Sequence, residues 1–324
     1  MIKLVENRVE WDDFVKNNGG HPLQLWGWGE LKVASENWSA HRLIIDDIGG
    51  AQVLIRKLPK PFKSMAYIPR GPVITDKNQR TKVLDELVNW AKEQGSIELK
   101  IEPDWVDDEG LTGWKKSKNH ILVARTLRIN LKQSKEELMT GMRRKTRYSV
   151  RKSQKSGVTV RKIDTNLENS MDDLKIILGI YNETANRAGF DLHKVNYYLD
   201  LIKFLGNYNQ IYLAEKDGEA LAFTWTIRTP AVEFWLYGGA NDKGRELEAN
   251  YALNWQAVLA SKEAGTAEYD MNGLLNDGIS TFKSGFAEEE TMMVGTYDKS
   301  LSPLYSLYEK ALPTGKKIVK KLNI

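Results

Sequence analysis

The chain has 324 residues, of which 41% are hydrophobic and 28% charged, and its formal net charge is +4. This length favours two domains over one. No run approaches the roughly 18 apolar residues that a membrane helix needs, and the N-terminus lacks the features of a secretory signal. We therefore expect a cytoplasmic protein. The absence of cysteine excludes disulfides, thiol nucleophiles and thiolate zinc sites.

The first half has the periodicity of a small α/β domain. Three strands, a helix and a fourth strand are predicted from alternating and helical apolar patterns. The predicted elements are strands at 40–46, 52–57 and 64–68, a helix at 79–94 and a strand at 96–102. Gly95 is placed to end the helix.

A basic segment follows. The apolar pattern predicts one helix over 134–156 that ends at Gly157. From Arg143 to Lys155, seven of thirteen residues are Arg or Lys and none is acidic. This clustering indicates a local anion-binding surface, and the alternative is a helix that joins two domains through surface charge. The apolar side of this helix would carry Leu138, Met142 and Val150.

The second half repeats the element order of the first. The predicted elements are strands at 210–216, 219–228 and 232–237, a helix at 248–264 and a strand at 266–271. We therefore predict a duplicated α/β plan, each copy with a mostly antiparallel sheet flanked by helices. The alternative is coincidence, because helix–glycine–strand order is common in α/β proteins. A last helix is predicted from Ser302 to Leu322, and we expect it to return to the first domain.

This element order resembles the N-acetyltransferase (GNAT) fold, in which splayed central strands receive an acyl donor. GNAT enzymes that use acetyl-CoA hold its pyrophosphate on a glycine-rich turn at a helix N-terminus, and the segments at 76–80 and 241–247 lack that turn. No nucleotide-binding loop or serine-hydrolase elbow occurs, and the four histidines have no metal-like spacing. We therefore expect no metal and no cofactor. Acyl transfer beside a basic helix points to a donor carried on RNA.

Seven segments resemble, in order, the conserved blocks of the Fem (FemABX) family. They are 22–32 (PLQLWGWGELK), 68–72 (IPRGP), 100–104 (KIEPD), 142–152 (MRRKTRYSVRK), 187–190 (RAGF), 237–240 (YGGA) and 282–286 (FKSGF). Members of this family are tRNA-dependent aminoacyltransferases that build the interpeptide bridges of peptidoglycan. Some carry a coiled-coil arm in the second domain. No long heptad stretch occurs here, so the chain resembles the compact form without the arm.

The resemblance implies two tandem GNAT-like domains. Domain 1 would comprise residues 1–133 and 300–324 and bind the precursor, and domain 2 would comprise 134–299 and begin with the basic helix. The implied reaction moves an amino acid from aminoacyl-tRNA to an amino group, the stem-peptide lysine, of UDP-MurNAc-pentapeptide or lipid II. We expect a monomer. Lys316, Lys317, Lys320 and Lys321 could contact the inner face of the membrane, although we favour a solvated tail.

The resemblance also implies site residues. Lys283 is the candidate for oxyanion stabilisation or for binding the tRNA terminus, with a lysine on a solvated strand end as the alternative. Glu102 or Asp104 could orient or deprotonate the acceptor amine, and the alternative is an ordinary turn. The predicted substrate-binding residues are Lys32, Arg70, Arg187, Tyr237 and Phe282. The predicted tRNA-binding residues are Arg143, Arg144, Lys145, Arg147, Arg151 and Lys152.

Two other functions remain open at this point. The first is an N-acyltransferase that uses CoA or another thioester in an unusual cradle. The second is an RNA-binding protein that has kept the fold and lost the activity. The intact FKSGF block argues against the second.

Overall fold

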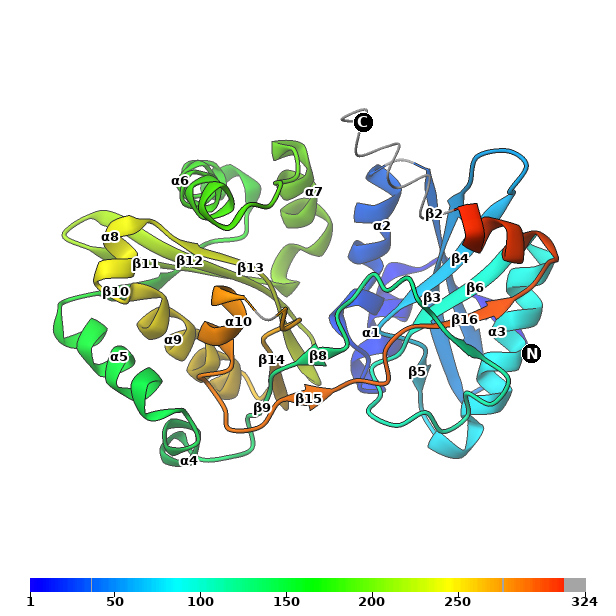
Figure 1. Ribbon diagram of the computed structural model, residues 1–324, viewed down its shortest axis with the longest axis horizontal. Helices are drawn as coiled ribbons and strands as arrows, with labels where there is room; N and C mark the ends of the chain where they lie inside the picture. Colours follow the sequence, from blue (N-terminus) through cyan, green and yellow to red (C-terminus); the bar gives the residue numbers. More distant parts are fainter. Residues whose placement is uncertain (36, 276, 312–324) are drawn as a thin grey trace. The chain divides into compact units, whose positions relative to one another are not determined.

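The computed structural model describes residues 1–35, 37–275 and 277–311 (Figure 1). The chain forms two compact units, each built from separate stretches of sequence. Unit 1 consists of Met1–Asn18, Lys32–Leu122 and the residues from Met293 on. Unit 2 consists of Gly19–Leu31 and Val123–Met292.

Eight strands of the described chain form one sheet in unit 1. Its order is β1-β2-β3-β4-β6-β16-β7, with β5 paired to β3. Neighbours are antiparallel except β4 and β6, which are parallel because a helix crosses over between them. The strands are β1 (Ile2–Leu4), β2 (Trp38–Ile45), β3 (Gly49–Lys57), β4 (Ser64–Pro69), β5 (Val73–Ile74), β6 (Ser96–Glu102), β7 (Lys115–Lys116) and β16 (Tyr297–Ser300).

The sequence of β6 gives the unit 1 sheet two different faces. Ile97, Leu99 and Ile101 are buried, and the last two belong to the apolar core that contains α3 residues such as Leu87. The alternate positions carry charged side chains, as period-two alternation requires. The helices of this unit are α1 (Arg8–Asn17), the end of α2 (Trp26–Ala34), the short 3₁₀ helix η2 (Lys77–Gln79), α3 (Arg80–Glu93) and residues 304–311.

Six strands of the described chain form the main sheet of unit 2, in the order β10-β11-β12-β13-β14-β9. Only β13 and β14 pair in parallel. A separate two-stranded sheet joins β15 to β8. The strands are β8 (Arg125–Thr126), β9 (Arg128–Asn130), β10 (Thr159–Lys162), β11 (Asn209–Lys216), β12 (Glu219–Arg228), β13 (Val232–Ala240), β14 (Glu268–Asp270) and β15 (Thr291–Met292).

Helices cover both faces of the unit 2 sheet (Figure 1). One face carries α9, against which α5 packs, together with α10, and the other carries α6 and α7. The helices are η1 (Pro22–Gln24), α4 (Lys135–Thr140), α5 (Arg144–Lys155), α6 (Leu167–Ala188), α7 (Val195–Leu205), η3 (Gly206–Tyr208), α8 (Asp242–Glu246), α9 (Ala249–Glu263) and α10 (Gly278–Lys283).

The predicted α/β fold with two GNAT-like copies is confirmed. In each unit three antiparallel strands are followed by a crossover helix and a parallel strand, which gives β2-β3-β4-α3-β6 in unit 1 and β11-β12-β13-α9-β14 in unit 2. An antiparallel strand then closes each sheet, β16 in unit 1 and β9 in unit 2.

The prediction of a single helix over 134–156 is wrong. The segment forms two helices, α4 and α5, because Gly141–Arg143 leaves the helical path after the capping box of Ser134 and Glu137 has started α4. Arg143, which precedes α5, is extended with φ −59° and ψ 145°. The apolar side is as predicted, since Leu138, Met142 and Val150 are all buried.

The chain passes from one compact unit to the other at positions that differ from the predicted domain boundaries at 133/134 and 299/300. Unit 2 begins again at Val123, because β9 pairs with β14. Unit 1 resumes at Met293, because β16 pairs with β6. The stretch Gly19–Leu31 belongs to unit 2, where the carbonyl of Gly20 accepts a hydrogen bond from Thr229 Oγ1 at 2.9 Å.

Residues 304–311 are helical and pack on unit 1. Tyr305 donates a hydrogen bond to Asp298 at 3.0 Å, and the Tyr308 ring meets Phe62 edge to face at 5.2 Å. The remainder of the helix predicted to Leu322, including the four lysines from Lys316 to Lys321, lies outside the described residues.

Candidate active site

Strands β13 and β14 of unit 2 separate after a short parallel pairing. Val232, Glu233 and Phe234 pair with Glu268, Tyr269 and Asp270. In the described residues the pairing stops there, whereas β13 continues to Ala240 along β12. In unit 1 the equivalent strands stay paired as far as Pro69 and Glu102. The open edge of β13 therefore distinguishes unit 2 from unit 1.

A cavity of about 460 Å³ lies at this open edge. It contains three aromatic walls, two arginines and one carboxylate, which together suit a ligand with apolar, anionic and cationic parts. Its lining comes from α6, β12, β13, α8, α9 and the segment of α10. The residues most relevant to binding are Arg187, Phe223, Trp235, Arg245, Asn250, Asn254, Asp277 and Phe282.

Asp277 is the carboxylate of the cavity. It precedes α10 and caps that helix, because Oδ1 accepts a hydrogen bond from the Ser280 amide at 2.7 Å. Partial burial disfavours the charge, but these hydrogen bonds from Ser280 outweigh it and hold the pKa of Asp277 below its ordinary value. Asp277 is therefore an anion at neutral pH.

The two arginines stand near the exposed Asp242. Arg187 donates to the Ala240 carbonyl at 2.9 Å and lies 3.5 Å from an Asp242 oxygen, and Arg245 lies 3.4 Å from the same oxygen. Surface ion pairs of this length are weak. Both guanidinium groups can therefore exchange this partner for a phosphate, which arginine binds with paired donors.

Lys283 lies against the Trp235 ring. The side chain is buried, donates to the Gly273 carbonyl at 3.0 Å and places Nζ 4.2 Å from the Trp235 ring centroid. Burial lowers the pKa of Lys283 to about 8, against the opposing effect of Asp270 and Asp277. Trp235 is itself fixed, because Nε1 donates to Thr224 Oγ1 at 2.5 Å.

The segment at 241–247 forms the short helix α8. Asn241 caps it by accepting the Gly244 amide at 2.8 Å, and the amides of Arg245, Leu247 and Glu248 bond to carbonyls within the same turn. A Cβ on Gly244 would lie 2.2 Å from the Leu221 carbonyl oxygen, so the helix also packs tightly on β12. These amides are not available to cradle a pyrophosphate in the way a CoA loop does.

The basic helix α5 contacts the segment that follows α10. The Arg143 amide donates to the Gly285 carbonyl at 2.9 Å, and Thr146 packs against the Gly285 Cα. The Thr146, Ser149, Val150 and Ser153 side of α5 is buried. The exposed basic residues are Arg143, Arg144, Lys145, Arg151, Lys152 and Lys155. Arg147 instead donates to the carbonyls of Thr140 and Met142 and so fastens α4 to α5.

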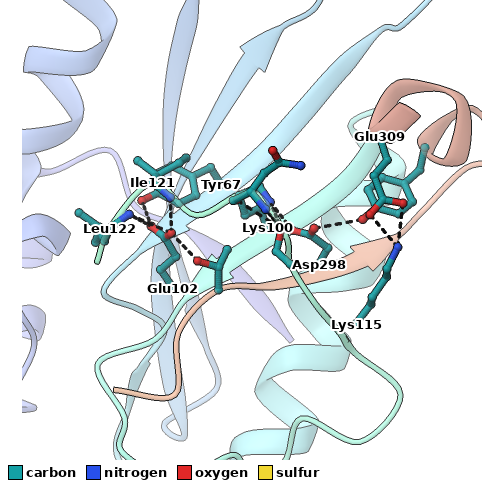
Figure 2. A network of polar contacts seen from close by, with 12 residues as sticks. Tyr67, Lys100, Glu102, Lys115, Ile121, Leu122, Asp298 and Glu309 are labelled. Carbon is teal, nitrogen blue, oxygen red and sulfur yellow. Dashed lines mark hydrogen bonds and ion pairs between the residues drawn. The ribbon is translucent and has the colours of Figure 1, made fainter. Parts of the chain in front are cut away.

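Glu102 of unit 1 is enclosed by donors (Figure 2). It accepts hydrogen bonds from the Tyr67 hydroxyl at 2.5 Å, from the Ile121 and Leu122 amides, and from Thr296 Oγ1 at 2.7 Å. With a 2% exposed side chain and its oxygens occupied, Glu102 holds the loop before β8 in place. This arrangement supports a structural role rather than the predicted proton transfer. Asp104 is half-buried after β6.

The other predicted residues of unit 1 are Lys32 and Arg70. Burial lowers the pKa of Lys32, in α2, to about 8. Arg70 follows β4 in a left-handed conformation with φ 48°, is buried, and stands before the cis peptide between Gly71 and Pro72. Burial and the neighbouring Glu102 raise the pKa of Tyr67 well above its ordinary value. The positive charge of Arg70 acts in the opposite direction but does not outweigh them.

The described part of the chain contains no group of three or more His, Cys, Asp or Glu side chains that could hold a metal ion. In the same residues no helix has the length and apolar character to cross a bilayer.

Sequence comparison decides the family. The profile of the FemAB family matches residues 7–122, 110–223 and 215–312. The chain belongs to the FemAB family.

FemAB relatives of known name align over nearly the whole chain. The lipid II:glycine glycyltransferase of Staphylococcus aureus (strain MRSA252) is 24% identical over 412 residues, which cover 97% of this chain and 96% of that protein. The enzyme of the same name from Staphylococcus epidermidis (strain RP62A) is 24% identical with the same coverage. Because the aligned length exceeds the 324 residues of this chain, the relatives carry residues with no counterpart here.

Solved structures agree on the fold. The crystal structure of FemX superimposes with a TM-score of 0.85 at 22% identity and covers 95% of this chain and 100% of its own. A tandem GNAT protein from the clavulanic acid biosynthesis pathway gives a TM-score of 0.50 at 11% identity and covers 94% and 99%. The resemblance to a two-domain GNAT-like family is thereby confirmed.

The structure groups some of the predicted FemAB site residues and separates others. Arg187 and Phe282 line the cavity of unit 2, and Lys283 contacts its Trp235 wall. Tyr237 lies in an aromatic cluster with α6 and α7, where its hydroxyl is 3.3 Å from that of Tyr197. Sequence reasoning missed Trp235, Arg245, Asn250, Asn254 and Asp277. The Asp277-x-x-Ser280 capping pattern was the available signal for the last of these.

Proposed function

We propose that this protein transfers an amino acid from aminoacyl-tRNA to an amino group of a peptidoglycan precursor, either UDP-MurNAc-pentapeptide or lipid II. Membership of the FemAB family supports an aminoacyltransferase. The names of the relatives, lipid II:glycine glycyltransferase, support a cell-wall acceptor. If lipid II is the acceptor, it would bring the protein to the inner face of the membrane, whereas UDP-MurNAc-pentapeptide would not.

The charge pattern of the unit 2 cavity carries the proposal. An aminoacylated nucleotide differs from acetyl-CoA because its acyl group bears an ammonium ion. Asp277 offers a fixed anion for that ammonium, Arg187 and Arg245 offer donors for a phosphate, and Phe282 and Trp235 offer faces for stacking. The exposed face of α5 would extend the contact to further phosphates of the tRNA.

A CoA donor is the second candidate, and the structure disfavours it. The amides of Gly244 and Arg245 in α8, and those of Leu247 and Glu248 after it, are already bonded within the same turn.

In the proposed reaction the neutral acceptor amine attacks the ester carbonyl. The tetrahedral oxyanion collapses, the carbon–oxygen ester bond breaks, and the tRNA leaves as its ribose alcohol while the amine loses a proton. We assign Lys283 to stabilisation of the oxyanion, because its ammonium is preorganised by Gly273 and Trp235 in a low-dielectric setting. With Glu102 enclosed by donors, we assign no protein base.

The deciding experiment supplies the protein with charged tRNA and either UDP-MurNAc-pentapeptide or lipid II, with and without ribonuclease. We expect an aminoacylated precursor that disappears when ribonuclease is added first. Ribonuclease-resistant transfer from aminoacyl-CoA would support the thioester enzyme instead. Absence of product with every charged tRNA would exclude the proposed activity.

A further inference from the structure

A second cavity, of about 100 Å³, lies in unit 1 on the face of the sheet opposite α3. Helix residues Tyr305, Tyr308 and Glu309 form its cover, and β3, β4 and β6 form its floor. A single buried water needs roughly 10–15 Å³, so the cavity has room for a molecule of several non-hydrogen atoms.

Most charged groups around this cavity already have partners (Figure 2). Lys100 pairs with Asp298 directly across from it on β16 and donates to Ser117 Oγ at 2.9 Å. Lys115 pairs with Glu309 at 2.6 Å. The Lys115–Glu309 pair and the hydrogen bond from Tyr305 to Asp298 hold the cover of the cavity to the sheet.

Glu98 lines the cavity without such a partner. The residue is only 2% exposed, and in the described chain its carboxylate makes no hydrogen bond and no ion pair. A buried carboxylate without a partner is costly. Burial accordingly raises the pKa of Glu98 to about 7, even though Lys100 lowers it.

Arg56 supplies an opposite charge at the exposed side of the same cavity. It lies over the Trp38 ring, with its guanidinium carbon 5.5 Å from the centroid, and it too makes no ion pair or hydrogen bond within the described residues. β4 separates its strand from that of Glu98. Both charges act on the Tyr308 hydroxyl. Burial raises its pKa most, Glu98 raises the pKa further, and Arg56 lowers it.

We propose that this cavity binds a small free amino acid, with its ammonium on Glu98 and its carboxylate on Arg56. The zwitterion alone satisfies both unpaired charges at once. Its ammonium would lie at the buried end, beside the Tyr305 and Tyr308 rings, and its carboxylate would face the solvent. A metal ion or a simple amine would leave Arg56 without an anion, and an acid would leave Glu98 without a cation. This site is separate from the unit 2 cavity and does not depend on the proposed function.

Isothermal titration calorimetry with the full-length protein tests this site. We expect glycine and L-alanine to bind, and methylammonium and acetate, which each carry one charge, to bind about tenfold more weakly or worse. Glu98→Gln and Arg56→Gln should each weaken glycine binding by about tenfold. Glu93→Gln on α3 and Lys57→Gln beside Arg56 are matched controls that should bind as the wild type does.

Proton release provides an independent readout. An ammonium beside Glu98 favours the ionised carboxylate, so binding near pH 7 should release protons, and the observed heat should depend on the buffer. Glu98→Gln should abolish that dependence while the protein stays folded, as thermal unfolding will show. Water alone in the cavity, seen as no heat with either amino acid, would overturn the assignment. Equal binding of methylammonium, or tighter binding of glycylglycine, would also overturn it.

Discussion

Lys283 and Trp235 are in direct contact, with the ammonium nitrogen 4.2 Å from the centre of the indole ring. The same indole lines the cavity at the open edge of β13. Trp235 therefore contacts both a buried cation and the space proposed for the donor. A change at either residue will be transmitted to the other, because the ring is held by Thr224 and the lysine by Gly273.

Replacing Lys283 by Met should separate activity from stability. We expect turnover to fall about 100-fold or more, the range seen when a preorganised oxyanion donor is removed, with a change in the precursor KM below about twofold. The folded-state pKa of about 8 lies below the ordinary 10.5, so the charged lysine opposes folding below about pH 8. The melting temperature should therefore stay unchanged or rise.

Initial rates and thermal unfolding measure the two effects of Lys283→Met. Lys175→Met, at an exposed position on α6, is the control and should alter neither. Equal losses in turnover and in precursor affinity would make Lys283 a binding residue.

Asp277→Asn should change donor selection without disturbing α10. Asparagine keeps the oxygen that caps the helix, so only the charge is lost. We expect the wild type to prefer glycyl-tRNA over N-acetylglycyl-tRNA, because only the first carries an ammonium ion. The variant should lose most of that preference, mainly through a higher KM for the charged donor.

Competition between the two donors measures the preference directly. Asp242→Asn removes a nearby surface carboxylate that does not line the cavity, and it should preserve the preference. An unchanged ratio in Asp277→Asn would place the ammonium elsewhere, whereas failure of every donor with the wild type would refute the proposed function itself.

Neutralising the exposed face of α5 should weaken tRNA binding in a salt-dependent way. Arg144→Gln, Lys145→Gln and Arg151→Gln combined should raise the donor KM and lower the slope of log affinity against log salt concentration, by about 0.7–0.9 for each phosphate that the variant no longer neutralises. Arg147→Gln serves for comparison, since it should reduce stability more than tRNA affinity. Filter binding over a salt series measures this slope. A slope equal to that of the wild type would show that α5 does not contact the RNA.

Glu98 should make the stability of unit 1 depend on pH. Its folded-state pKa of about 7 lies above the ordinary 4.5, so the folded protein binds this proton more tightly than the unfolded chain does. Stability is therefore full below about pH 4.5 and falls as the pH rises through about 7, by about 3 kcal/mol in total. Glu98→Gln should flatten this part of the profile. Urea unfolding from pH 4.5 to 8 measures it, and parallel profiles would contradict the prediction.

Gly285→Ala should destabilise the contact between α5 and the segment after α10. A Cβ at this position would lie 2.1 Å from Thr146 Oγ1, and we expect the free energy of unfolding to fall by about 1–3 kcal/mol. Thr146→Ala removes the hydroxyl, so the double variant should recover part of that stability. Additive effects in a double-mutant cycle would show that the two residues do not interact.

Local sequence patterns predicted the repeated elements of the fold closely. β6 and β12 have the predicted bounds, and α3 and α9 differ from the prediction by one residue at each end. Each of these elements buries apolar side chains at regular intervals, and this regular spacing is the signal from which a helix or a strand is predicted. The helix break at Gly141–Arg143 was missed because the surrounding apolar positions keep the helical period across it.

The site could be predicted only in part, because its residues meet through the topology. Arg187 and Phe282 were found through family blocks, whereas Arg245 and Asp277 lie outside those blocks. The separation of β13 from β14 depends on where pairing stops, and nothing in the alternation of either strand marks that point. The structural role of Glu102 arises from Ile121, Leu122 and Thr296, which are distant in sequence.

The origin of the closing strands has a consequence for biosynthesis. β16 completes the sheet of unit 1, yet it is encoded after the whole of unit 2. During translation, one edge of β6 therefore stays unpaired until the second half of the chain, which carries β16, has left the ribosome. The unit that is translated first is the last to be finished, and a chain truncated before Tyr297 would release it with an exposed strand edge prone to aggregation.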